Sequence, residues 1–380
     1  MVSLLKNCLQ WIELSESALR HNVFLVSSFC KSRVVLGALL KANAYGHGLL
    51  PMAELYQRCG VSLFLVHSFQ EAWTLRKNGF RERLLLIGPQ SEEELAYSLK
   101  QDFEITVYNE ETLRALHRFQ KKIKKTARLH VKIETGTYRQ GLDPKIIPSF
   151  IALLKTVKHE LKGFSSHFAN IEDTSDTTYY QKQMSIFKKS VQTFEKQGFR
   201  AEALHIACSA AVLLYPETQL DIVRPGIALY GYASSPELAY ALKLPEPLKP
   251  VLSWRTRLCQ IKSVPEGHSV GYGLTFKTTR NTRLGILPIG YYDGFDRRLS
   301  NLGFALVHGK RAPILGRVCM NLTMLDLTDI SEAALNDTVT LIGTDGAETI
   351  TADHLASSVN TIAYEILARL NPLIPRIIVL

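Results

Sequence analysis

A single lysine stands where an apolar segment gives way to a glycine-rich one. Lys41 follows the run VVLGALL over 34–40 and opens the stretch KANAYGHG over 41–48. The apolar run predicts a buried strand, and the glycines after it predict a tight loop. A buried lysine loses its charge through desolvation, and its neutral amine can form a Schiff base with an aldehyde cofactor. The alternative is an ordinary strand-to-helix turn that carries a solvated lysine.

Further polar side chains stand at the ends of other short apolar runs: His67, Lys132, His167, His205 and Arg224. Each of them alone is compatible with a scaffold role, because both nitrogens of a histidine are readily satisfied inside a folded protein. Parallel barrels, however, keep their chemistry at the carboxyl ends of their strands. Taken together with Lys41, these residues predict a functional site at that end of a barrel.

The elements that would position these residues are eight short strands. Apolar runs of strand length cover 34–40, 63–66, 84–87, 104–107, 129–133, 163–166, 203–206 and 221–223. Polar segments with helical periodicity separate them, including 91–95, which has a serine cap and early acidic residues, and 177–197. Eight alternating units in about 220 residues predict an α/β fold of the TIM-like (β/α)8 type. A doubly wound sheet is the alternative, but it usually has about six strands.

The pattern changes after Tyr232. Prolines at 245, 247 and 250 stiffen the chain, so we place a linker at 241–250, between a barrel at 10–240 and a smaller all-β domain at 251–380. Strands in this domain are predicted at 253–261, 284–289, 305–308, 324–327 and 339–342, and one amphipathic helix at 351–370. Residues 11–14 predict a strand, and the segment 1–14 could pair with the C-terminal domain or with the barrel.

Composition limits the classes of protein that fit. The chain has 380 residues, 46% of them hydrophobic, which is enough for two domains with substantial cores. Its net charge is +10, but the one dense basic cluster, KKIKK over 121–125, lacks interleaved aromatic residues. That cluster fits a solvated helix end better than a nucleic-acid site. We therefore expect an anionic small molecule as the ligand and no nucleic acid.

The six cysteines show neither CxxC spacing nor a zinc-like grouping. This pattern predicts reduced thiols and no metal site. The start of the sequence lacks the features of a secretory signal, and no apolar stretch approaches membrane-spanning length. We accordingly expect a cytoplasmic protein that does not bind a membrane.

The sequence resembles the alanine racemases, a pyridoxal-phosphate-dependent family of fold type III. LKANAYGHG at 40–48 is similar to their cofactor-attachment signature, and similar stretches follow in family order. These are HVKIETG at 130–136, SHFA at 166–169, SAA at 209–211, VRPGIALYG at 223–231, GYGLTF at 271–276, GYYDGF at 290–295 and GRVCM at 316–320. The resemblance covers about 11–376. It implies a barrel followed by a β-domain, and a homodimer with shared active sites.

The resemblance also implies a role for each matching residue. Lys41 would bind pyridoxal 5'-phosphate and serve as one catalytic base, while Tyr272 of the partner subunit would be the other. Arg224 would face the pyridine nitrogen, and His167 would link Arg224 to that tyrosine. The remaining cofactor contacts would come from Tyr45, His205, Ser209, Gly226 and Ile227. The substrate carboxylate would meet Arg139 and the backbone of Met320, and Lys132 matches a lysine that is carbamylated in many members.

This chemistry is consistent with what racemisation requires, an electron sink and an acid/base group on each face of the substrate. An arginine has no lone pair that accepts a proton, so it keeps the pyridine nitrogen unprotonated and the sink weak. The expected reaction is the interconversion of L- and D-alanine, supplying D-alanine for cell-wall peptide. A serine or broad-specificity racemase remains the alternative, because Tyr138, Cys208, Asn321 and Pro372 depart from the usual pattern.

Three other functions are alternatives to a racemase. A barrel-only pyridoxal-phosphate carrier would lack the β-domain. An amino-acid decarboxylase would present a carboxylate to the pyridine nitrogen, where this chain has Arg224. A nucleic-acid-binding protein is supported by net charge alone.

Overall fold

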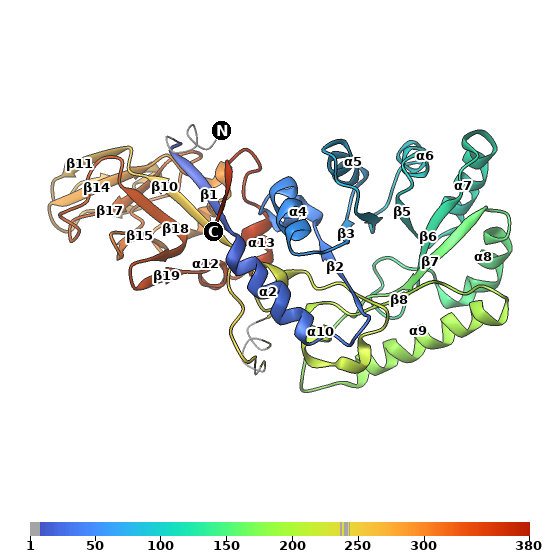
Figure 1. Ribbon diagram of the computed structural model, residues 1–380. Helices are drawn as coiled ribbons and strands as arrows, with labels where there is room; N and C mark the ends of the chain where they lie inside the picture. The colour runs from blue at the N-terminus through green and yellow to red at the C-terminus, as the bar shows by residue number, and fades with distance from the viewer. Residues whose placement is uncertain (1–7, 236–237, 239–241, 243) are drawn as a thin grey trace. The chain divides into compact units, whose positions relative to one another are not determined.

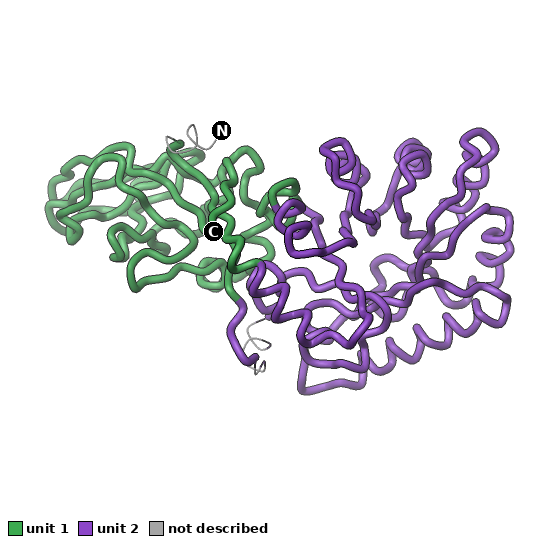
Figure 2. The backbone as a smooth tube through the Cα atoms, in the orientation of Figure 1, with its two compact units in different colours: residues 1–19, 43–51, 249–380 green, residues 20–42, 52–248 purple. Residues whose placement is uncertain are grey.

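The computed structural model describes residues 8–235, 238, 242 and 244–380. Backbone contacts divide the chain into two compact units (Figure 2). Unit 1 comprises Met1–Leu19, Asn43–Pro51 and Lys249–Leu380, and unit 2 comprises Arg20–Ala42 and Met52–Leu248. Parts of the expected linker at 241–250 and of the segment 1–14 lie outside the described residues. None of the described helices is long and apolar enough to cross a bilayer.

Unit 2 contains the predicted barrel. Its eight strands are β2 (Val35–Leu39), β3 (Leu63–Val66), β4 (Arg83–Leu86), β5 (Glu104–Val107), β6 (Ala127–Lys132), β7 (His159–Ser165), β8 (Leu204–His205) and β9 (Ile222–Val223). They are all parallel, in the order β8-β7-β6-β5-β4-β3-β2-β9. Backbone bonds from Asp221 N to Leu204 O and from Arg224 N to Ala207 O, both 2.9 Å, join the two ends of this order. The predicted TIM-like barrel is thus confirmed as a near-closed one.

Helices follow most of these strands along the chain (Figure 1). They are α4 (Leu49–Arg58), α5 (Phe69–Lys77), α6 (Glu92–Lys100), α7 (Glu110–Ile123), α8 (Ile147–Leu154), α9 (Thr178–Lys196) and α10 (Ser209–Leu214), while α2 (Glu16–Ser28) precedes β2. The predicted cap of α6 is confirmed, because Ser91 and Glu94 form a capping box. The basic cluster at 121–125 lies at the end of α7, where Lys124 adopts a left-handed conformation that ends the helix.

Unit 1 is built mainly from strands. One sheet has the order β16-β15-β18-β10-β1-β20, with β19 on β18. Its members are β1 (Gln10–Ser15), β10 (Leu252–Arg257), β15 (Phe304–Val307), β16 (Lys310–Pro313), β18 (Thr338–Asp345), β19 (Glu348–Ile350) and β20 (Arg376–Val379). A second sheet pairs β11 (Gln260–Val264), β14 (Thr282–Leu287) and β17 (Thr323–Asp326), and β12 (Ser269–Val270) forms a hairpin with β13 (Phe276–Lys277). The predicted strand at 11–14 is β1, which pairs with β10 and β20 of this unit.

Two predicted elements of unit 1 are wrong in their extent. The strand expected at 253–261 is two strands in different sheets, because the chain turns at Leu258 and Cys259, whose N–H groups donate to Asp337 and Ile286. The helix expected at 351–370 is two, α12 (Ala352–Ser358) and α13 (Ala363–Ala368). Asn360 between them has a φ of 54°, and this left-handed conformation ends α12.

Candidate active site

Strand β2 carries Lys41 to the carboxyl end of the barrel, where the chain takes an unusual turn. The short helix α3 (Lys41–Tyr45) is left-handed: Ala42, Asn43, Ala44 and Tyr45 have φ values of 53–55°. This conformation costs an L-residue roughly 1–2 kcal/mol. Local strain of this kind is typical of functional sites whose surroundings enforce it.

Hydrogen bonds within unit 1 hold the end of this turn. Asn43 accepts twice, from Gly48 N at its carbonyl (2.9 Å) and from Leu49 N at its side-chain oxygen (2.8 Å). Arg376 donates to Gly46 O at 2.8 Å. Gly46 has a φ of 77°, and a Cβ there would lie 1.8 Å from Leu367 O, so only glycine fits. Gly46 of the sequence motif therefore serves close backbone approach.

A cavity at the carboxyl ends of the barrel strands gathers most of the predicted site residues of unit 2. Its charged or titratable lining residues are Lys41, Lys132, Arg139, His167, His205 and Arg224. The lining, as far as the structure describes it, contains no aspartate or glutamate. A cavity with four cationic side chains and uncharged histidines suits an anionic ligand.

The lysine amine in this cavity is made easier to deprotonate. Burial lowers the pKa of Lys41, the positive charge of Arg139 lowers it further, and the carboxylate of Glu71 acts in the opposite direction. The lowered pKa increases the fraction of neutral amine, which is the form that a nucleophilic or basic lysine needs. The structure thus supplies the desolvation that the sequence predicted for Lys41.

Arg224 is fixed by four hydrogen bonds. It donates to His205 O at 2.9 Å, to Ser166 O at 2.6 Å and to Ile206 O at 3.3 Å, and it also bonds to the Nδ1 atom of His205. Burial lowers the pKa of Arg224 to about 10, which leaves the guanidinium charged at neutral pH. The arginine is therefore a rigid cationic donor that faces the cavity.

Two further cavity residues have lowered pKa values, which favour their neutral forms. Burial, together with Arg224 and Arg139, lowers the pKa of Lys132 to about 8, and its amine donates to Gln140 at 2.9 Å. Burial and the positive charge of Arg224 place the pKa of His167 well below its ordinary value. Among the described residues no hydrogen bond joins Arg224 to the imidazole of His167, so their predicted link stays a prediction.

The predicted phosphate-binding residues lie together after β8 and β9. The hydroxyl oxygen of Ser209 accepts from Gly226 N at 2.9 Å and from Ala228 N at 3.2 Å, and Ile227 lies between these two amides in the chain. Cys208 precedes Ser209, and burial raises the pKa of its thiol to about 11, so it stays protonated. The structure thus brings Ser209, Gly226 and Ile227 to one place.

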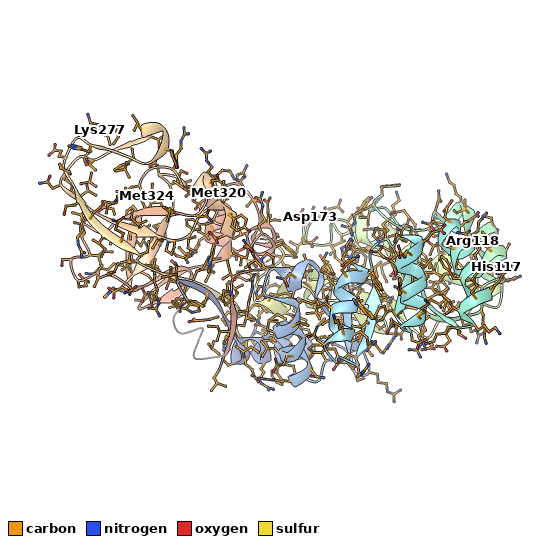
Figure 3. All side chains as sticks on the ribbon, turned by 90° about the horizontal axis from the view of Figure 1, so that it is seen from above. His117, Arg118, Asp173, Lys277, Met320 and Met324 are labelled. Atoms are coloured by element: carbon orange, nitrogen blue, oxygen red, sulfur yellow. The ribbon has the colours of Figure 1, made fainter. Side chains whose placement is uncertain are left out.

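Three predicted site residues belong to unit 1. Tyr45 is buried and packs against Tyr364, with ring centroids 5.9 Å apart. Tyr272 lies between Gly271 and Gly273 on a short 3-10 turn, η4 (Tyr272–Leu274), and 73% of it is exposed. Met320 is also exposed, and Figure 3 labels it on the strand-rich part of the chain, as it does Met324.

The structure does not bring His67 to the cavity, and it contains two buried polar residues outside the predicted set. His67 is exposed, its backbone N–H donates to Glu71, and it is not part of the cavity lining. Glu104 and His130, by contrast, are buried in the barrel and bond to each other at 2.8 Å. The signal that could have revealed them was a charged or titratable residue inside an otherwise apolar strand run.

Comparison with known proteins assigns this chain to one family. The family described as "Alanine racemase, N-terminal domain" matches residues 14–234, and "Alanine racemase, C-terminal domain" matches 251–378. An alanine racemase of Leptospira interrogans is 38% identical over 375 residues, which cover 97% of this chain and 95% of that protein.

Solved structures agree with the sequence comparison. The crystal structure of alanine racemase from Bacillus anthracis with bound L-Ala-P has a TM-score of 0.92 at 33% identity and covers 98% of this chain and 95% of that one. A histidine racemase from Leuconostoc mesenteroides has a TM-score of 0.89 at 26% identity and covers 98% of both chains. Both family domains, in order and over nearly the whole length, show that this chain belongs to the alanine racemase family.

Proposed function

We propose that this protein is a pyridoxal-5'-phosphate-dependent racemase that interconverts L-alanine and D-alanine. One observation carries the proposal: Lys41, shifted toward its neutral amine, and the rigid cation Arg224 line the same cavity. The relatives named alanine racemase support the choice of substrate.

The donors in unit 2 fit this cofactor. Lys41 would hold it covalently, Arg224 would face its ring nitrogen, and the Ser209 hydroxyl with the amides of Gly226 and Ile227 would bind its phosphate. Tyr45 and His205 are proposed as further contacts. When bound, the cofactor supplies the electron withdrawal that makes the α-proton of an amino acid acidic.

Arg224 favours racemisation over the competing reactions of this cofactor. A guanidinium donates hydrogen bonds but cannot give up its proton at neutral pH. The ring nitrogen facing it would remain unprotonated, which limits electron withdrawal and discourages decarboxylation or transamination. A decarboxylase would need a carboxylate there, and the described lining has none.

The second base is proposed to be Tyr272 of the partner subunit. On this chain Tyr272 is 73% exposed and Leu274 beside it is 72% exposed, so this turn is accessible to another copy. Lys41 would move the proton on one face of the substrate and the tyrosine on the other, as racemisation needs. Arg139 and the backbone of Met320 are proposed to bind the substrate carboxylate.

Lys132 is proposed to carry a carbamyl group. Its lowered pKa of about 8 provides neutral amine, the form that reacts with carbon dioxide. The anionic product would neutralise part of the cationic cavity and would orient Arg139. Unmodified Lys132 instead adds to the positive charge around Lys41.

The decisive experiment mixes two inactive variants. Lys41→Ala and Tyr272→Phe proteins should each racemise alanine very slowly. If each site takes its lysine from one chain and its tyrosine from the other, a mixed dimer has one intact site. Random reassortment should then restore about a quarter of wild-type activity. Failure to restore activity would contradict the shared site, and alanine turnover by Lys41→Ala alone would contradict the role of the lysine.

We also propose a cytoplasmic location and the use of D-alanine for cell-wall peptide. Residues 10–240 are proposed as the cofactor-binding barrel, 241–250 as the linker and 251–380 as the C-terminal β-domain. A serine or broad-specificity racemase is the second candidate, favoured by the structural likeness to a protein named histidine racemase. Comparing kcat/KM for alanine, serine and histidine on the cofactor-loaded protein distinguishes the candidates.

A further inference from the structure

A chain of hydrogen bonds passes through the core of the barrel. His205 bonds to Arg224 and also to His130, with 2.8 Å between Nε2 of His205 and Nδ1 of His130. His130 Nε2 lies 2.8 Å from Glu104 Oε2, and Glu104 accepts from Arg83 at 2.7 and 3.1 Å. Arg224 follows β9 and Arg83 begins β4, so the chain connects the carboxyl ends of the strands with their amino ends. Barrel cores are usually filled by aliphatic layers instead.

The backbone is shaped to make room for the two histidines. The pairing of β6 with β7 changes register between Leu129 and His130, which is a bulge that places His130 opposite Gly163. A Cβ at Gly163 would lie 2.2 Å from His130 Nδ1 and 3.1 Å from His205 Nε2. Since the histidines need both the bulge and the glycine, this part of the barrel is adapted to them.

The acceptor at one end fixes the protons along the whole chain. The carboxylate of Glu104 can only accept, so His130 must donate from Nε2 and accept at Nδ1. His205 must then donate from Nε2 to His130, which leaves its Nδ1 atom to accept from Arg224. Only one neutral tautomer of each histidine satisfies every bond.

Burial and charge support neutral histidines between charged ends. His130 is fully buried and His205 is 2% exposed, and burial lowers the pKa of both imidazoles. Burial alone would raise the pKa of Glu104, but hydrogen bonds from His130 and Arg83 lower it to about 2. The carboxylate is thus charged at neutral pH, and Arg83, whose side chain is 41% exposed, balances it.

We propose that Glu104 and His130 are positioning residues that impose the Nε2–H tautomer on His205 and thereby orient the guanidinium of Arg224. The group toward which Arg224 is oriented rests on the proposed function, whereas the assignment of the histidine tautomers does not. The carboxylate at the far end of the barrel would act on the site through three hydrogen bonds and without touching any ligand.

The first test measures the tautomers directly in the wild-type protein. Nitrogen-15 NMR of histidine-labelled protein at neutral pH should show His130 and His205 each protonated at Nε2 and unprotonated at Nδ1. Either histidine protonated at Nδ1, or doubly protonated, would overturn the proposal. This measurement does not depend on bound cofactor or on turnover. The tautomer proposal can therefore be wrong while the proposed function is right, and the proposed function can be wrong while the tautomer proposal is right.

The second test changes the far end of the chain. Glu104→Leu removes the acceptor and should leave His130 and His205 as mixtures of tautomers. Glu104→Gln should restore the single tautomer, because its amide oxygen can accept from His130 while the half-exposed Arg83 turns to water. Glu160→Gln, which alters an exposed carboxylate on β7, is the matched control.

Kinetics of the cofactor-loaded variants complete the test. At metal sites, loss of a residue that fixes the tautomer of a ligating histidine costs about 10–100-fold in activity, and we expect a loss of that size here. Glu104→Leu should lower kcat for alanine to that extent with little change in KM, because the substrate carboxylate is bound elsewhere. Unchanged tautomers in Glu104→Leu would overturn the proposal, as would a failure of Glu104→Gln to restore them. If Glu104→Leu does not fold, the wild-type and Glu104→Gln spectra still decide.

Discussion

Gly163 shows that a missing side chain can matter as much as a functional group. His130 and His205 form their bond in the space that any larger residue would fill. This glycine does not have a positive φ, so its role is steric and not conformational. Its replacement therefore tests how tightly the histidine pair is packed.

Gly163→Ala should destabilise the protein by about 1–3 kcal/mol, the usual cost of overpacking a core. The added methyl group would collide with an imidazole that hydrogen bonds hold in place. Gly37→Ala is the matched control, because its Cβ would meet the movable end of the Leu65 side chain, at 2.6 Å. Urea unfolding of both variants checks the prediction, and an equal or larger cost at Gly37 would contradict it.

Acid should weaken the fold through Glu104. Its pKa is about 2 in the folded protein and near 4.5 when unperturbed, so the carboxylate stabilises the fold above pH 4.5 and loses this effect as pH falls toward 2. Roughly 2 kcal/mol should be lost by pH 3. Unfolding free energies of wild type and Glu104→Gln, measured between pH 6 and pH 3, should converge by that amount. Parallel pH profiles would show that Glu104 titrates normally.

Single residues divide into those that the sequence revealed and those that it did not. Lys41, Lys132 and Arg224 stand at strand ends in polar or glycine-rich surroundings, and the structure brings them into one cavity. Glu104 begins a strand and His130 stands inside one. Their partners come from other strands and cannot be read from spacing. Predicted roles in binding and catalysis remain predictions for all of them.

The predicted boundaries of helices and strands were wrong where the backbone changes direction without a glycine or proline. The expected helix at 351–370 divides at Asn360, whose left-handed conformation a periodicity argument does not detect. The expected strand at 253–261 divides because its two halves join different sheets. The barrel strands were easier to predict, since each is an apolar run bounded by polar segments.

Asn360 should resist replacement by a β-branched residue. Asn360→Val should lower the unfolding free energy by about 1–2 kcal/mol, because a branched side chain clashes in the left-handed conformation. Asn360→Gly tolerates that conformation and should stay near wild type. Thermal or urea unfolding distinguishes them, and two equally stable variants would argue against a conformational role for Asn360.

At the level of the whole molecule, unit 1 exposes a set of large apolar and aromatic side chains. Its members include Tyr272, Leu274, Tyr291, Tyr292, Met320 and Leu322, each more than 40% exposed. Large apolar side chains exposed in number on one part of a soluble protein often belong to an interaction surface. They support the homodimer proposed above.

Leu274→Arg should convert the dimer to a monomer. A charged side chain placed in a packed interface is left without a partner and costs several kcal/mol. Light scattering should give twice the 42.7 kDa of one chain for wild type and 42.7 kDa for the variant. Leu335→Arg, at another exposed leucine of unit 1, should stay dimeric. A monomeric wild type, or a dimeric Leu274→Arg protein, would contradict this assembly.

The bond between Arg376 and Gly46 can form only late in biosynthesis. The two residues are 330 positions apart, and β20, which begins at Arg376, pairs with β1 in the same unit. A ribosome adds residues in order, and early segments begin to fold before later ones exist. The turn after Lys41 therefore cannot acquire this bond until Arg376 has been translated and has left the exit tunnel. A nascent chain would therefore leave the turn after Lys41 without this bond until synthesis of this segment is complete.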